Sequence, residues 1–187
     1  PSKKELQEYY ANKYYQEAQG SYELSYDKAE IKYLLNKIEQ KHVVAKTISN
    51  IETGSLLDVG SGEGFTLSHF DNLGWDCLGL DFSSEGIKSQ NPEQARLLIQ
   101  GDIFENLNDI IKDDKKFDLI VLDNVLEHVL KPFELLANLN KIISDDGVLV
   151  VEVPNDFSLL QKYLMENNYI DREFWVSPLE HLSYFNK

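Results

Sequence analysis

A glycine-rich segment at residues 56–64 has the residue types and the spacing of a ligand-binding loop. It reads Leu-Leu-Asp-Val-Gly-Ser-Gly-Glu-Gly, so a short apolar run ends in an acid and is followed by alternating glycines. Glycine lets the backbone turn tightly and approach a ligand, and a helix behind the loop adds unpaired N–H groups and the positive end of its dipole. We therefore expect cofactor contacts from Asp58, Gly60, Ser61, Gly62 and Gly64.

The spacing differs from the dinucleotide fingerprint G-x-G-x-x-G. That pattern would place its third glycine at position 65, where this chain has Phe65, and the observed spacing is D-x-G-x-G-x-G. A NAD-dependent oxidoreductase is one class of protein that such a loop allows. It is disfavoured by Phe65 and by the lack of a Tyr-x-x-x-Lys pair, since Tyr163 is followed by Asn167 at the lysine position.

Acids also follow the later apolar runs, at Asp81, Asp102 and Asp123. In open α/β sheets ligands bind outside the carboxyl ends of the strands, so these carboxylates are expected to meet at one edge. Asp81 can accept both hydroxyls of a ribose. Asp102 can accept from an adenine amino group, with Ile103 covering the ring. The alternative for each acid is a loop carboxylate or a helix cap.

Apolar runs of strand length alternate with helical patterns from Ser55 onward. Strands are expected at 56–59, 77–80, 96–100, 117–122 and 148–153, and helices at 65–73, 84–90, 105–112, 132–143 and 157–167. A turn is expected at 145–147, Asp-Asp-Gly. This alternation predicts an α/β fold with a doubly wound, mostly parallel sheet whose strands are buried on both faces.

Two helices are expected ahead of the sheet. The first covers 3–18 and carries tyrosines at 9, 10, 14 and 15, which either cover the cofactor or pack; the second begins at Asp27, with Glu30 completing a capping box. The chain is thus predicted to be one domain, with a helical cap over 1–50 and a Rossmann-like core over 51–187. His42 and His69 are interpreted as surface or helix residues, and Trp75 as packing.

Composition limits the classes of partner. The formal net charge of the 187 residues is −14, which repels phosphate backbones and argues against nucleic acid. Apolar runs are too short to span a bilayer, and no signal peptide opens the chain. Cys77 is the one cysteine, so an intrachain disulfide is excluded. We expect a cytoplasmic protein that acts on a small-molecule acceptor without a membrane partner; a homodimer stays open.

These motifs resemble those of class I S-adenosylmethionine (SAM)-dependent methyltransferases over roughly residues 27–185. The matching segments are 57–64 (LDVGSGEG), 79–83 (GLDFS), 101–103 (GDI) and 117–120 (FDLI). The resemblance implies SAM as cofactor and S-adenosylhomocysteine as product. It places the glycine loop on the methionine part, Asp81 on the ribose, Asp102 near the adenine and Phe82 along that ring. A site lined by acids and without basic residues suits the cationic groups of SAM.

A narrower resemblance covers 124–129, Asn-Val-Leu-Glu-His-Val. It is similar to the E-x-x-E-H segment of ubiquinone-pathway and small-RNA 3′-end methyltransferases, in which two acids and a histidine hold a divalent metal. Here Asn124 replaces the first acid, and His181 resembles a later histidine of the RNA enzymes. Glu127, His128 and His181 therefore bind a metal, face the substrate, or act only locally. We expect no metal to bind there. We expect His128 or His181 either to act as the base that takes a proton from the acceptor or to orient the acceptor.

The expected function is methyl transfer from SAM to a small-molecule acceptor, with oxygen favoured over nitrogen or carbon. A catalytically silent SAM-binding or regulatory protein is the second alternative. Similar methyltransferases usually end in a further helix and an antiparallel strand pair, which this sequence lacks. The chain is therefore expected either to be truncated at its C-terminus or to leave its fifth strand as an edge that needs cover.

Overall fold

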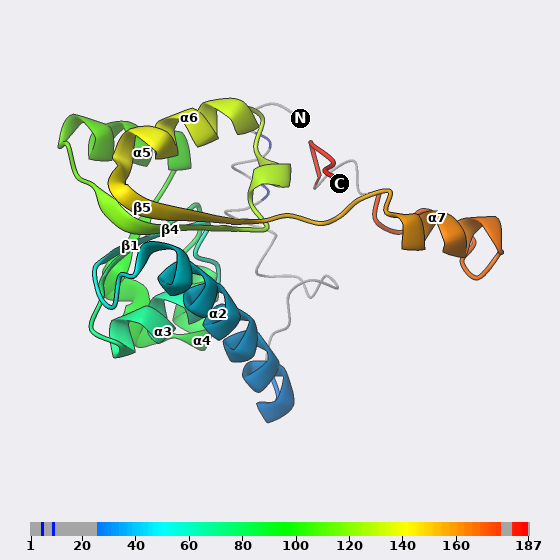
Figure 1. Ribbon diagram of the computed structural model, residues 1–187, viewed down its shortest axis with the longest axis horizontal. Coiled ribbons are helices and arrows are strands. Elements are labelled where there is room, and N and C mark those ends of the chain that lie inside the picture. Colours follow the sequence, from blue (N-terminus) through cyan, green and yellow to red (C-terminus); the bar gives the residue numbers. More distant parts are fainter. Residues whose placement is uncertain (1–4, 6–8, 10–25, 177–180, 187) are drawn as a thin grey trace.

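In a computed structural model of the chain, helices cover both faces of a central sheet (Figure 1). The structure describes Glu5, Tyr9, residues 26–176 and residues 181–186. Most of the helix expected at 3–18, including three of its four tyrosines, lies outside the described residues. On the described part of the chain, no helix combines the length and the apolar character needed to cross a membrane.

Helices and strands alternate along the chain as the sequence predicts. In order, they are α2 (Lys28–Ser49), β1 (Ser55–Val59), α3 (Phe65–Asn72), β2 (Asp76–Asp81), α4 (Glu85–Gln90), the 3₁₀ helix η1 (Pro92–Leu97), β3 (Leu98–Gln100), α5 (Ile103–Lys112), β4 (Phe117–Asp123), the 3₁₀ helix η2 (Leu126–His128), α6 (Pro132–Ile142), β5 (Ile143–Glu152) and α7 (Leu159–Glu166).

The sheet has the order β3-β2-β1-β4-β5, and every pairing is parallel. The chain moves outward from β1 through β2 to β3, then returns to the other side of β1 for β4 and β5. The strand order therefore reverses between β1 and β4. This is the doubly wound α/β fold that the sequence predicts, and such a reversal is where ligands bind.

The central strand β1 carries apolar side chains on both of its faces. Leu56 packs into the cluster beneath α2 and α3, together with Phe70, whereas Leu57 and Val59 pack into the opposite cluster beneath α5 and α6. Successive side chains of a strand point to opposite faces, so a strand covered on both sides needs apolar residues at both registers. Figure 1 shows the same two layers, with α2, α3 and α4 on one face and α5 and α6 on the other.

The edge strands differ from the expectation that all five strands are buried on both faces. Most β5 residues are half-buried or exposed, and two of the three β3 residues are exposed. β3 is also shorter than the expected 96–100, because a 3₁₀ helix that starts at Pro92 runs through Leu97. Proline supplies no backbone N–H, so it suits a helix start better than a strand.

The turn expected at 145–147 lies inside β5. Phe117 pairs with Ile143, and the next paired residues are Leu119 and Val148, so β5 advances five residues where β4 advances two. The Asp-Asp-Gly segment therefore marks an irregularity within a strand that begins at Ile143 rather than at Val148.

The capping box predicted at the start of α2 is present. The carboxylate of Asp27 accepts from the N–H groups of Ala29 and Glu30, and the Glu30 carboxylate accepts from the Asp27 N–H at 2.7 Å. Ile38 and Ala45 of α2 are buried, whereas Leu35 is 39% exposed. The helix thereby lies on the α3 side of the sheet.

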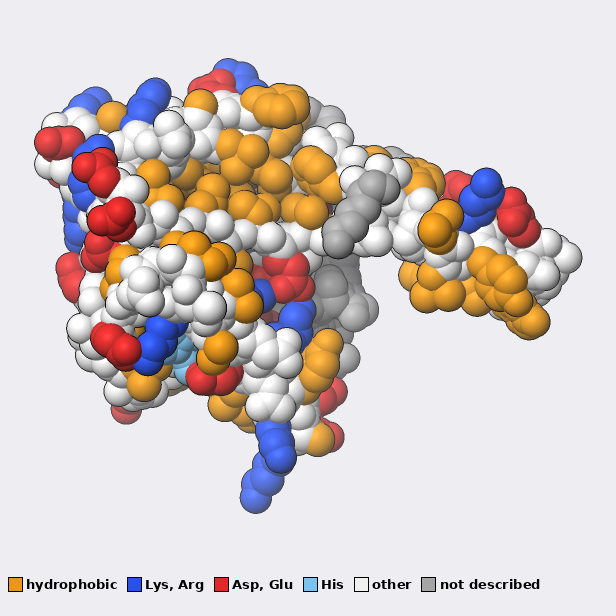
Figure 2. Space-filling model, viewed as in Figure 1, with side chains coloured by type: hydrophobic (Ala, Val, Ile, Leu, Met, Phe, Trp, Pro, Cys, Tyr) orange, Lys and Arg blue, Asp and Glu red, His pale blue; other side chains and the backbone are white. Residues whose placement is uncertain are grey.

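A second apolar surface lies away from the core. Figure 1 shows α7 extending from the body of the molecule, and Figure 2 shows hydrophobic side chains over α6, β5 and α7. Phe133 on α6 and Leu159 on α7 are 86% and 87% exposed. Within the described chain, β5 is the edge strand of the sheet on this side.

Candidate active site

A cavity of about 330 Å³ opens at the carboxyl ends of the central strands, with α2 as one wall. It therefore lies at the reversal of strand order where the fold predicts a ligand site. Ten of the twelve expected site residues line it: Asp58, Gly60, Ser61, Gly62, Gly64, Asp81, Phe82, Ile103, Asp123 and His128. Asp102 and His181 are not part of its lining.

The glycine loop needs glycine for both space and conformation. Gly60 and Gly64 have φ near +76°, a left-handed conformation that other residues rarely adopt. A Cβ at Gly60 would lie 2.3 Å from a methyl group of Val125, and one at Gly64 would lie 2.6 Å from Ile87. The loop is also tied to β2, because the Gly60 N–H donates to the Leu80 carbonyl at 2.7 Å. It therefore presents a fixed backbone to the cavity.

Asp81 is held in place by the loop that it faces. Its Oδ2 accepts from the Gly62 N–H and its Oδ1 from the Ser83 N–H, both at 2.9 Å. Burial raises the pKa of Asp81 to about 6, against the opposing effect of these backbone hydrogen bonds. Each carboxylate oxygen has a second lone pair, so Asp81 can still accept from two hydroxyls of a ligand.

Asp58 is the most deeply buried acid of the cavity wall. Burial raises the pKa of this carboxyl to about 8; the neighbouring Asp123 and Asp81 raise it further, and Lys41 opposes them. Near pH 7 the group therefore favours its neutral form. A cation entering the cavity would favour the carboxylate instead, so Asp58 can respond to a positively charged ligand.

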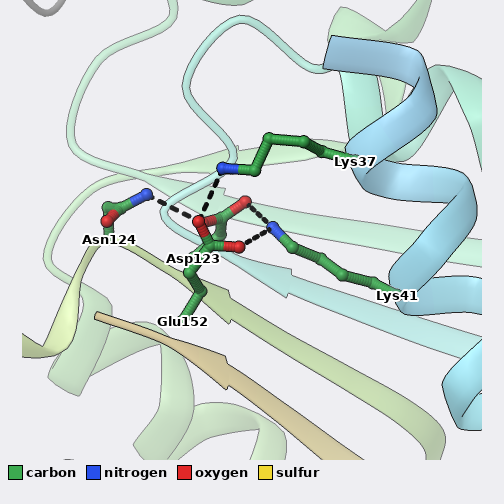
Figure 3. Close-up of polar contacts among 5 residues, drawn as sticks. All are labelled: Lys37, Lys41, Asp123, Asn124 and Glu152. Carbon is green, nitrogen blue, oxygen red and sulfur yellow. Dashed lines mark hydrogen bonds and ion pairs between the residues drawn. The ribbon is translucent and has the colours of Figure 1, made fainter. Parts of the chain in front are cut away.

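Two lysines of α2 contradict the expectation of a site without basic residues. Figure 3 shows that Lys37 and Lys41 reach the ends of β4 and β5. Lys41 forms an ion pair with Asp123 and lies 2.8 Å from Oε2 of Glu152, and Lys37 lies 2.6 Å from Oε1 of the same glutamate. The lysines neutralise acids at this edge and join α2 to the sheet. Lys37 and Lys41 are four residues apart and therefore lie on one face of α2, and this spacing is visible in the sequence.

Asp102 has the helix-cap role that the sequence left as an alternative. Its Oδ1 accepts from the Glu105 N–H at 3.0 Å at the start of α5. The carboxylate is buried but does not line the cavity. The following residue, Ile103, does line it, as expected.

Glu127 lies behind the cavity wall, next to His128. Its side chain is 1% exposed, and neither carboxylate oxygen has a hydrogen-bond partner among the described residues. Burial raises the pKa of Glu127 to about 7, with further contributions from the negative charges of Asp156 and Asp123. Oε1 of Glu127 lies 3.7 Å from Nε2 of His128, which is within ion-pair distance when both side chains are charged.

The segment 181–186 brings His181 to this pair. The N–H groups of Leu182 and Ser183 donate to the Glu127 carbonyl at 2.7 and 3.1 Å. The rings of His181 and His128 then lie with centroids 5.0 Å apart at 74°. His128 and His181, which we expected to lie near each other, are therefore in ring contact. His128 lines the cavity and His181 does not.

The same cluster allows a test of the metal site found in similar enzymes. The ligand atoms of Glu127, His128 and His181 lie within 4.8 Å of one another. Mg²⁺ prefers oxygen ligands, however, and this set offers one carboxylate and two imidazoles. Asn124, in the place of the first acid of that segment, donates to Asp123 instead. The residues do not fit a Mg²⁺ site, and no step below depends on one.

Several wall residues were not predicted from the sequence. They come from α2, its N-terminal flank and the start of α3: Tyr26, Leu34, Lys37, Ile38, Lys41, Phe65 and Thr66. The Tyr26 hydroxyl donates to Glu63 of the glycine loop at 2.5 Å, and its ring meets Phe65 edge-on. The segment before α2 thus contacts the loop directly.

Sequence comparison places this fold and cavity in a known family. The family model described as "Methyltransferase domain" matches residues 26–187. The chain therefore belongs to the methyltransferase-domain family. It is also similar to ubiquinone biosynthesis O-methyltransferases: that of Glaesserella parasuis is 28% identical over 129 residues, 66% of this chain and 54% of that protein. That of Rickettsia bellii is 24% identical over 125 residues, 67% and 50% of the two chains. The chain spans about half the length of these curated relatives.

Solved structures share the fold. A SAM-dependent methyltransferase from Archaeoglobus fulgidus superposes with a TM-score of 0.63 at 21% identity, over 82% of this chain and 62% of that one. The plantazolicin methyltransferase BpumL, solved with S-adenosylhomocysteine, gives 0.53 at 20% identity, over 79% and 59%. At these identities the likeness establishes the Rossmann-like architecture.

Proposed function

We propose that the chain binds SAM in the cavity and transfers its methyl group to a hydroxyl of a small-molecule acceptor. One observation carries the proposal: the cavity brings the glycine loop, Asp81 and His128 to the reversal point of a methyltransferase-family sheet. A cofactor site and a candidate base thus share one space.

The cofactor is expected to follow the cavity wall. Its methionine part would lie on the loop at Gly60–Gly64 and at the N-terminus of α3, where unpaired N–H groups suit a carboxylate. The ribose hydroxyls would donate to Asp81, and the adenine would lie along Phe82 and Ile103. Asp58 would supply negative charge for the sulfonium and amino groups. The same charge would repel the pyrophosphate of a cofactor such as NAD.

Methyl transfer is an in-line displacement. The acceptor oxygen bonds to the methyl carbon as the carbon–sulfur bond breaks, and the sulfonium leaves as the neutral thioether of S-adenosylhomocysteine. Because the sulfonium is already activated, the protein supplies mainly position and a dry site. A hydroxyl acceptor must also lose its proton. His128 is the histidine in the cavity wall, and histidine exchanges protons readily near neutral pH.

Glu127 and His181 support His128 in this scheme. A carboxylate 3.7 Å from the His128 ring would stabilise the imidazolium that forms when His128 takes the acceptor proton. His181, packed on the His128 ring, would hold its orientation. The three residues thus combine a base, a charge partner and a positioning group.

Two further observations support a small hydroxyl-bearing acceptor. The two curated relatives described above are named as O-methyltransferases, which favours oxygen. The net charge of −14 disfavours a nucleic acid substrate. We therefore propose a small-molecule acceptor that carries a hydroxyl group.

The test uses SAM with a deuterated methyl group. The protein is incubated with it and with a panel of phenols, catechols, sugars and amines, and products are read by mass spectrometry. Label on oxygen supports the proposal, and label on nitrogen or carbon overturns the acceptor class. Labelled SAM that binds but transfers to no member of the panel, nor to a small-molecule extract, supports a silent SAM-binding protein instead.

A further inference from the structure

A second histidine cluster lies outside the cavity, between α2 and α3. Glu39 and His42 are three residues apart on α2 and so share a face, and His69 faces them from the last turn of α3. The ligand atoms of the three residues lie within 4.8 Å of one another. The two histidines lie in helices, as one of the two interpretations had it, and they are half-buried and in contact with each other.

Two of the three distances among these atoms match the edge of a metal tetrahedron, and the third is within 4.8 Å. Nδ1 of His42 lies 3.3 Å from Nε2 of His69, and that nitrogen lies 3.4 Å from Oε2 of Glu39. Ligands about 2.0–2.1 Å from a tetrahedral Zn²⁺ are separated by about 3.3–3.4 Å. An ion can therefore enter between the three atoms with little change in the backbone.

The surroundings hold the histidine rings in fixed orientations. The His42 ring packs on Phe70 at 4.8 Å between centroids and edge-on against Trp75 at 6.1 Å. The His69 ring meets Phe70 edge-on at 5.0 Å. Imidazole rings held in place by packing reduce the cost of assembling a site.

We propose that Glu39, His42 and His69 form a binding site for a divalent transition metal of the Zn²⁺ type. Two imidazoles and one carboxylate suit Zn²⁺ and its neighbours in the series, whereas Mg²⁺ and Ca²⁺ prefer oxygen ligands. The Glu39 side chain is 57% exposed, so the site opens to solvent on that side and a water molecule can supply the fourth ligand.

The expected role of the ion is to join two elements that bound the cavity. α2 forms a cavity wall through Leu34, Lys37, Ile38 and Lys41, and α3 begins directly behind the glycine loop. A metal bound by both helices would hold that wall against the core. Because the ion binds the folded arrangement, it should stabilise the protein in proportion to its affinity.

The test titrates Zn²⁺ into the chain in competition with a chromogenic chelator. The variants are His42→Ala, His69→Ala and Glu39→Gln. Glu39→Gln changes an exposed side chain with little change in shape, so it keeps the test valid if either alanine variant fails to fold. The matched controls are His128→Ala and His181→Ala, which alter the other histidine cluster.

The proposal predicts one bound equivalent of Zn²⁺ that each of the three variants weakens by about 100-fold or more and that the two controls retain. Excess Zn²⁺ should also raise the Tm of the wild type by about 5–10 °C, with a smaller rise in Glu39→Gln. Excess Mg²⁺ should neither compete nor stabilise. The absence of such an equivalent, or its loss only in the His128 and His181 variants, would overturn the proposal.

Discussion

Lys41 on α2 forms an ion pair with Asp123 at the end of β4, so a helix of the cap closes onto the carboxyl edge of the sheet (Figure 3). Lys41 also reaches Glu152 of β5 at 2.8 Å, and its side chain is only 15% exposed. The contact places a second positive charge, beside that of Lys37, in a wall that also carries Asp58, Asp81 and Asp123. It therefore links the position of α2 to the charge balance of the cavity.

We expect Lys41→Met to destabilise the protein by about 1–3 kcal/mol, because it leaves the partly buried carboxylate of Asp123 without its ion-pair partner. The matched control is Lys37→Met. Lys37 is more exposed, at 35%, and its partner Glu152 keeps Lys41, so the loss should be below about 1 kcal/mol. Urea denaturation measures both. Equal losses, or a larger loss at Lys37, would show that the ion pair does not hold α2.

Cofactor binding should release a proton near pH 7. Burial raises the pKa of Asp58 to about 8, so its carboxyl is mostly protonated in the empty cavity at pH 7. The cationic groups of SAM favour the carboxylate, so binding expels the proton and the affinity should rise as pH increases from about 6 to about 8. Calorimetry in buffers of different ionisation enthalpy measures the number of protons released for each SAM bound.

The comparison with S-adenosylhomocysteine supplies the control for this proton release. That product lacks the sulfonium charge, so it should release less of a proton than SAM. The Asp58→Asn variant should release none through this group. If the wild type and Asp58→Asn released the same number of protons on binding SAM, Asp58 would not be the group that loses the proton.

Loss of the candidate base should lower turnover and leave cofactor affinity unchanged. His128→Ala is expected to reduce kcat by about 10²–10⁴-fold, the range for a general base. His181 does not line the cavity, so His181→Ala should cost less, and His181→Phe should recover part of the loss by restoring ring packing on His128. The measurements are steady-state kinetics with a hydroxyl acceptor and calorimetry with SAM. Full activity in both alanine variants would leave the histidines without a chemical role.

Turnover should not require Mg²⁺. Asn124 in place of an acid leaves the cluster at Glu127, His128 and His181 short of oxygen ligands. The assay compares added Mg²⁺ with EDTA in the His42→Ala background, where EDTA cannot act through the proposed site between α2 and α3. We expect less than about a twofold change. Strict dependence on a divalent ion would make these three residues metal ligands.

The parts of the fold that depend on local pattern could be predicted from the sequence. The glycine loop, Asp81 and the capping box at Asp27 each depend on a few neighbouring residues, and the structure contains the local structures predicted at all three. The apolar runs likewise predicted the parallel sheet, since strands covered on both faces need apolar residues at each position.

Features that depend on packing between distant elements were not predicted. Lys37 and Lys41 lie in a helix whose existence was clear, but the face that meets the sheet is decided by tertiary packing. Asp102 follows strand β3 and caps helix α5. The same sequence position therefore fits both a ligand-binding carboxylate and a helix cap. His42 and His69 are 27 residues apart, and only the packing of α2 on α3 brings them together.

The most direct test of the account is a calorimetric titration of S-adenosylhomocysteine into the wild type, Asp81→Ala and Asp102→Ala. Asp81 is placed to accept two hydroxyls, so Asp81→Ala should weaken binding by about 2–4 kcal/mol, and Asp102→Ala should weaken it less. NAD should not bind. Equal affinity of Asp81→Ala and wild type would contradict the ribose assignment, and tight binding of NAD without S-adenosylhomocysteine would contradict the proposed function.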